Sequence, residues 1–137
     1  MTFVVGPLPV IVDASAAVEM LDGHEWWQSA FDQWAADDRM VLAPAHFLAE
    51  VANASLRGRR FSVADVAARI ERLVAAGVEL ADRGPAGLIE AIGLADQYGL
   101  SVYDALYLQL ALDVEGELAT LDKDLRRAAT AEGVPLT

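Results

Sequence analysis

Four acidic residues of the 137-residue chain occupy positions from which their carboxylates could act together. Asp13 and Asp122 each follow a short apolar run, at a point where the chain turns into a predicted helix. Glu50 and Asp104 lie inside predicted helices among apolar neighbours, where an isolated charge is costly to bury. Buried carboxylates converge where a cation joins them. A set of oxygen ligands suits Mg²⁺ or Mn²⁺ and disfavours zinc.

Such a site would support phosphodiester hydrolysis. A Mg²⁺ or Mn²⁺ ion, singly or as a pair, can lower the pKa of a bound water, neutralise a phosphate and orient an in-line attack. The chain has no Cys, which excludes a disulfide framework, a thiol nucleophile and Cys-based zinc sites. It has two histidines, His24 and His46, which we interpret as surface or packing residues rather than general bases.

Each acid also has a simpler interpretation, and the residues alone leave it open. Asp13 and Asp122 stand where a helix N-cap is expected. Glu50 and Asp104 could lie on polar stripes that face water. Against this, the helix that carries Asp104 has few other polar residues, so we expect it to be largely buried. Those residues are Ser101, Gln109 and Asp113.

Short apolar runs alternate with helical patterns along the whole chain. Strands are predicted at 9–12, 40–43, 78–80 and 118–121. Between and after them, helices are predicted at about 16–21, 25–37, 47–58, 62–77, 85–99, 102–114 and 122–133. This alternation predicts an α/β fold, with a mostly parallel sheet of about four to five short strands and helices on both faces. Acids just after its strands would line the crevice at their carboxyl ends.

Composition favours one globular domain spanning residues 1–137. Hydrophobic residues make up 55% of the chain, which excludes intrinsic disorder, and the length is too small for two ordinary domains. The apolar start is interrupted by Gly6, Pro7 and Pro9 and lacks a basic segment, so we expect neither a signal peptide nor a membrane span. A cytoplasmic protein is expected.

Charge argues against nonspecific binding of nucleic acid. The chain has 10 basic and 21 acidic residues, a net charge of −11. The basic residues are clustered, however, and two clusters each follow one of the four acids: Arg57, Arg59 and Arg60 after Glu50, and Lys123, Arg126 and Arg127 after Asp122. They could contact RNA or a protein partner, or they could be ordinary solvated faces.

Four motifs in order resemble the PIN-domain ribonucleases, and among them the VapC-type toxins of bacterial toxin–antitoxin pairs. They are Ile-Val-Asp-Ala-Ser at 11–15, Leu-Ala-Glu-Val-Ala-Asn-Ala at 48–54, the stretch 94–108 and Leu-Ala-Thr-Leu-Asp at 118–122. Within the third, Leu-Ser-Val-Tyr-Asp-Ala is the most specific. The resemblance covers nearly the whole chain, except that residues 1–8 precede the first strand by more than is usual in such toxins.

The resemblance implies a PIN-like three-layer α/β/α domain and a Mg²⁺- or Mn²⁺-dependent endoribonuclease. Its metal-binding and catalytic acids would be Asp13, Glu50, Asp104 and Asp122. Ser15 and Thr120 would orient a ligand or phosphate, with Asp124 as an assistant or substitute for Asp122. The implied partners are RNA, a helical VapB-type antitoxin and a second copy of the chain in a homodimer.

Two other functions are weighed against the nuclease. A catalytically weak PIN-like module could bind RNA or a partner without cutting, although the presence of all four acids favours the enzyme. A phosphotransfer domain with Asp13 as nucleophile lacks support, because the residue two positions later is Ser15 and not a second Asp. Trp26 and Trp27 cannot face the same way on one helix, so at least one should lie near the surface, at a partner interface.

Overall fold

The computed structural model describes residues 6–137. Its strands are β1 (Val10–Val12), β2 (Val41–Ala43), β3 (Val78–Leu80) and β4 (Glu117–Ala119). Its helices are α1 (Ala14–Leu21), α2 (Glu25–Ala36), α3 (Phe47–Asn53), the π-helical segment η1 (Ala54–Gly58), α4 (Val63–Ala75), α5 (Pro85–Tyr98), α6 (Val102–Val114) and α7 (Lys123–Ala131). Of the unusual N-terminal stretch 1–8, residues 1–5 lie outside the described residues.

The four strands form one parallel sheet in the order β3-β2-β1-β4. Val10 is aligned with Val41 of β2 on one side and with Glu117 of β4 on the other. An isolated parallel bridge from Leu118 to Leu136 extends the β4 edge. The predicted parallel sheet is therefore confirmed. The chain steps outward from β1 to β3 and then crosses to β4, so strand order switches direction between β1 and β4, where such sheets bind ligands.

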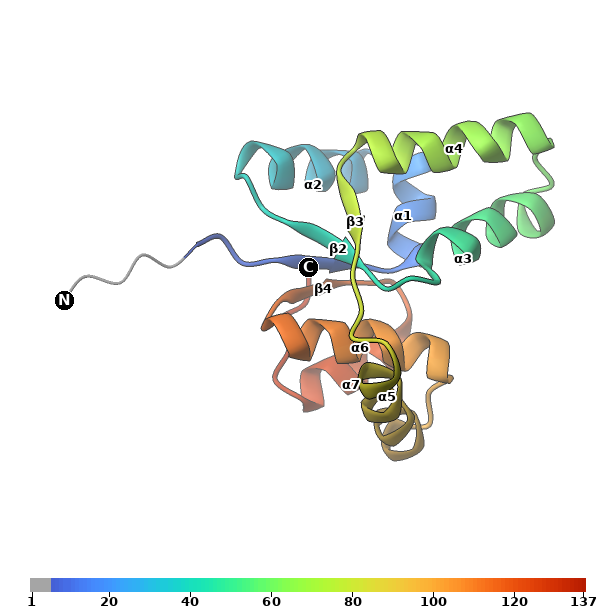
Figure 1. Cartoon of the computed structure of the whole chain (residues 1–137). Coiled ribbons are helices and arrows are strands. Elements are labelled where there is room, and N and C mark those ends of the chain that lie inside the picture. The colour runs from blue at the N-terminus through green and yellow to red at the C-terminus, as the bar shows by residue number, and fades with distance from the viewer. Residues whose placement is uncertain (1–5) are drawn as a thin grey trace.

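Helices cover both faces of the sheet, which gives three layers (Figure 1). Helices α1 to α4 lie on one side, and α5 to α7 on the other. The main core contains the buried strands and the inner faces of both layers, including Phe47 of α3 and Tyr107 of α6. A smaller apolar cluster, Ala91, Ala95 and Ala105, joins α5 to α6. The α6 helix is largely buried, as expected from its sequence.

The predicted helix ends agree closely with the structure. Ser62 and Ser101 cap α4 and α6 by accepting hydrogen bonds from the backbone N–H of Asp65 and Asp104, at 3.1 and 3.0 Å. Pro85 is at the start of α5, and Gly99 ends it in the left-handed conformation.

Two boundaries differ from the sequence prediction. The strand expected at 118–121 ends at Ala119, because the next N–H groups bond side chains: Leu121 donates to Ser15 Oγ and Asp122 to Thr120 Oγ1, both at 3.0 Å. The helix expected to end near Gly58 is α-helical only to Asn53 and continues as η1. Its register widens there, so that the Arg59 N–H donates to Ala54.

Of the two adjacent tryptophans of α2, one is buried and the other is exposed, as expected. Trp27 is 5% exposed and Trp26 is 54% exposed, with the two rings edge to face. Within residues 6–137, none of the helices combines the length and apolar character that a bilayer crossing needs.

Candidate active site

Asp13 is held rigidly at the end of β1. Its carboxylate is 5% exposed and accepts hydrogen bonds from the Ser15 hydroxyl at 2.6 Å, from the Ala16 N–H at 3.0 Å and from the Thr120 hydroxyl. The Ala16 bond makes Asp13 the N-cap of α1. Burial raises the pKa of this carboxyl, the three hydrogen bonds oppose the shift, and the charge of Asp104 adds to it.

Thr120 links the ends of β1 and β4. Its buried hydroxyl donates to Asp13 and accepts the N–H of Asp122, so one side chain connects two of the four acids. Asp122 is exposed and caps α7 through a 2.9 Å bond from the Leu125 N–H. The capping interpretation thus holds for Asp13 and Asp122, and both carboxylates still lie at the carboxyl edge of the sheet.

Glu50 enters the site from α3 and is half-buried, not on a water-facing stripe. Its Oε1 accepts a 2.9 Å hydrogen bond from the Tyr107 hydroxyl. His46 Nε2 lies 2.7 Å from the same oxygen, in contact but without a hydrogen bond. His46 therefore packs against site residues, and the pattern could have indicated this, because residues four apart share a helix face.

Asp104 lies in the first turn of α6 and connects the four acids electrostatically. Its half-buried carboxyl has a pKa raised by burial, then by the charges of Asp122 and Glu50, while Ser101 and His46 act in the opposite direction. Because Asp104 also raises the pKa of Asp13, it interacts with each of the other three acids. The charge of Asp104 thus links it to the other three carboxylates, which come from different elements.

The donor set fits Mg²⁺ or Mn²⁺ chemically. It consists of carboxylate oxygens with hydroxyls beside them, and their mutual repulsion is what a divalent cation relieves. Within residues 6–137, no three acidic or histidine side chains are already grouped closely enough to hold a metal ion. Asp13 and Asp122 use oxygens in capping bonds, so binding would require small side-chain rearrangements.

The remaining predicted residues lie at different distances from this centre. Asp124 is exposed and pairs with Arg127 at 2.7 Å instead of joining the four acids. Arg126 donates to the Thr120 carbonyl at 3.0 Å, which puts a cation beside the end of β4. Arg59 is paired with Asp22 at 2.7 Å. Three others, Arg57, Arg60 and Lys123, are exposed and form no ion pair with any described residue.

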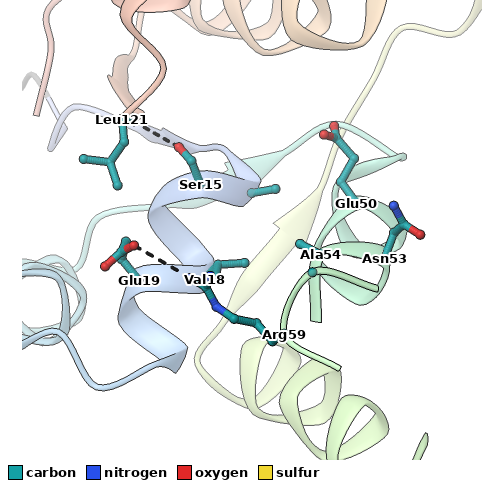
Figure 2. Close-up of a pocket in the computed structure, with 10 residues that line it drawn as sticks. Ser15, Val18, Glu19, Glu50, Asn53, Ala54, Arg59 and Leu121 are labelled. Atoms are coloured by element: carbon teal, nitrogen blue, oxygen red, sulfur yellow. Dashed lines mark hydrogen bonds and ion pairs between the residues drawn. The ribbon is translucent and has the colours of Figure 1, made fainter. Parts of the chain in front are cut away.

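A cleft of about 460 Å³ opens between α1 and the α3–η1 segment, and of the four acids Glu50 lines it. Figure 2 shows Ser15 and Leu121 at one side of it and Glu50 on the other, with Arg59 at the far end. Apolar side chains of Val18 and Ala54 form part of its wall. The cleft thus offers a surface of polar and apolar side chains that includes Glu50.

Comparisons with known proteins agree with this architecture. A model of the PIN domain matches residues 10–131. A search of curated proteins finds no match. The fold is similar to that of PAE2754 from Pyrobaculum aerophilum, which is 23% identical with a TM-score of 0.69, over 94% of this chain and 89% of that one.

Two further solved structures have a similar fold. VapBC2 from Rickettsia felis, bound to a DNA fragment from their promoter, has a chain that is 13% identical with a TM-score of 0.73, over 95% of this chain and 98% of that one. VapC20 from Mycobacterium tuberculosis, a toxin that cleaves the sarcin-ricin loop, is 18% identical with a TM-score of 0.68, over 87% and 94%. At these identities the likeness concerns the fold.

Proposed function

The chain belongs to the PIN domain family, and we propose that it is a Mg²⁺- or Mn²⁺-dependent endoribonuclease that acts as the toxin of a VapBC-type pair. The proposal is supported above all by the electrostatic interaction of Asp104 with Asp13, Glu50 and Asp122, which come from separate elements of the fold. Repulsion among acids lowers the stability of the fold, so their retention in this arrangement favours a functional role.

The proposed mechanism gives each residue a distinct task. When bound, the cation would lower the pKa of a water and neutralise the scissile phosphate. Asp13, Glu50, Asp104 and Asp122 would hold it and fix its position. Ser15 and Thr120 keep the Asp13 carboxylate in one orientation through their hydroxyl bonds. Arg126, next to the Thr120 carbonyl, would attract the RNA backbone toward the site.

The proposed partners follow from the same family. We propose a helical VapB-type antitoxin as the inhibitor, supported by the fold likeness to VapBC2 and VapC20. We also propose a symmetric homodimer, supported by exposed apolar side chains on α5, namely Leu88, Ile89 and Ile92. Sedimentation at micromolar concentration should give twice the monomer mass without antitoxin, and a monomer would contradict the dimer.

Cleavage of structured RNAs tests the proposed activity. EDTA should abolish cleavage, and Mg²⁺ or Mn²⁺ should restore it. Binding of either ion should also raise the melting temperature by linkage, because only the folded chain assembles the carboxylates. RNA binding without cleavage at any concentration of Mg²⁺ or Mn²⁺ would contradict the proposal and indicate a non-catalytic binding module.

A further inference from the structure

The Glu50 carboxylate contacts two side chains outside the set of four acids, Tyr107 and His46. We propose that Tyr107 and His46 are positioning residues, which fix Glu50 Oε1 so that the carboxylate presents its other oxygen to a divalent cation in one orientation. This inference rests on the function proposed above. It adds two residues whose task is to align a ligand, rather than to contact the cation or RNA.

Tyr107 reaches Glu50 from the opposite layer of the fold. It is 1% exposed, and its hydroxyl donates to Glu50 Oε1 at 2.9 Å. A buried hydroxyl without a partner is costly, so this bond is strongly favoured once α6 packs against α3. Burial first, and then the nearby Glu50 charge, raise the pKa of Tyr107, so the phenol stays protonated and keeps donating.

His46 also contacts Glu50 Oε1, the oxygen that accepts the bond from Tyr107. Its Nε2 lies 2.7 Å from Glu50 Oε1 without making a hydrogen bond, and this nitrogen is buried. The imidazole packs edge-on against the Tyr107 ring, with 5.0 Å between ring centroids, and lies 5.7 Å from the Tyr103 ring. His46 thereby restricts both the carboxylate and the phenol that bonds it.

The Tyr107 bond also fixes the position of one proposed ligand, Glu50, relative to another, Asp104. Tyr107 lies three residues after Asp104, on the same side of α6. The bond from Tyr107 therefore ties the Glu50 carboxylate of α3 to the helix that carries Asp104. Tyr107 and His46 both contact Oε1, and within residues 6–137 no hydrogen bond engages Oε2. Groups that orient metal ligands in this way commonly change metal affinity or activity 10- to 100-fold when they are removed.

The test replaces one hydroxyl and compares it with a matched control. Tyr107→Phe removes the bonding hydroxyl, while Tyr103→Phe removes a hydroxyl from a 64%-exposed ring on the same helix. Calorimetric titration with Mn²⁺ alone should show a Kd about 10- to 100-fold higher for Tyr107→Phe and little changed for Tyr103→Phe. Equal Mn²⁺ affinity in wild type and Tyr107→Phe would overturn the inference.

A cycle with Glu50→Ala, which removes the oxygen that accepts the Tyr107 hydroxyl, separates positioning from a general structural effect. If Tyr107 acts through Glu50, Tyr107→Phe should change neither Mn²⁺ affinity nor cleavage rate in the Glu50→Ala background. An undiminished effect there would contradict the inference.

A second variant serves if Tyr107→Phe does not fold. His46→Phe keeps the ring packing and removes the nitrogens, and it should weaken Mn²⁺ binding. Unchanged binding would overturn the role of His46. Failure of the wild type to bind Mn²⁺ would instead overturn the proposed function itself.

Discussion

Asp104 carries an electrostatic penalty whenever no cation is bound. Burial and the charges of Asp122 and Glu50 raise the pKa of its carboxyl above the ordinary 3.8, so the folded chain holds a proton more tightly than the unfolded chain does. The penalty is complete above the raised pKa. It disappears as the pH falls from that value toward 3.8, because the folded state then takes up the proton first.

Removing this charge should therefore stabilise the protein in EDTA. Asp104→Asn is expected to melt at a higher temperature than wild type at neutral pH, and the difference should shrink as the pH approaches 3.8. Thermal unfolding of both proteins at several pH values measures this. A variant that melts lower than wild type at neutral pH, or a difference that is constant with pH, would contradict a penalty on the charged form of Asp104.

At the residue scale, the sequence is most informative where a polar residue directly follows a predicted strand. Asp13 and Asp122 were identifiable because each follows an apolar run. Their capping of α1 and α7 is confirmed, and their role as site acids stays a prediction. Tyr107 could not be identified as a partner of Glu50, because their contact depends on how α6 packs against α3 across 57 residues of sequence.

At the scale of elements, the close approach of β1 and β4 depends on Gly116. A Cβ atom at this position would stand 2.8 Å from the Pro9 carbonyl oxygen and 3.0 Å from Ile11 Cδ1. The next residue, Glu117, donates its N–H to that same carbonyl at 2.8 Å. The backbone therefore has no room for a side chain where β4 begins alongside β1.

Gly116→Ala should consequently destabilise the fold by about 1–3 kcal/mol, as overpacking does. Gly93→Ala is the matched control, because Gly93 lies inside α5 with nothing within 4 Å of an added Cβ. There alanine should stabilise the helix by roughly 0.5–1 kcal/mol. Denaturant unfolding of the two variants gives the comparison, and equal stabilities would contradict this account of the β1–β4 contact.

Most elements could be predicted because local signals agreed with the tertiary fold. Apolar runs, Ser caps, Pro85 and Gly99 determined the limits of strands and helices to within a few residues. The π-helical turn at Ala54–Gly58 could not be predicted, since no residue in it is a helix breaker before Gly58. Within it, the buried Ser55 hydroxyl accepts a 3.1 Å bond from Arg69 of α4, a contact that only the folded chain makes.

At the scale of the whole molecule, a net charge of −11 must be reconciled with the binding of RNA. Overall repulsion means that local cations have to offset the field near the site. Arg126 is well placed beside the end of β4, and Arg127 follows it on α7. Arg59 is paired with Asp22 and Arg127 with Asp124, so each cluster keeps two cations that form no ion pair with a described residue.

Salt dependence of RNA affinity tests this arrangement. Each phosphate contact that is lost should reduce the slope of log affinity against log salt by about 0.7 on a single strand. Arg126→Ala/Arg127→Ala and Arg57→Ala/Arg59→Ala/Arg60→Ala should each flatten the slope if the cluster contacts RNA. Arg72→Ala is the control, because this residue lies near the end of α4 that precedes β3, away from the acids. Unchanged slopes in both cluster variants would mean that RNA is held elsewhere.

The most direct test of the central claim is the metal-dependent cleavage of RNA by wild type and by Asp104→Asn. Asp104 is the acid that interacts with all three others, and the amide removes its charge while keeping its volume. The account predicts cleavage by wild type in Mg²⁺ or Mn²⁺, a loss of more than about 100-fold in Asp104→Asn, and similar losses in Asp13→Asn, Glu50→Gln and Asp122→Asn. Full activity in a folded Asp104→Asn variant would contradict it.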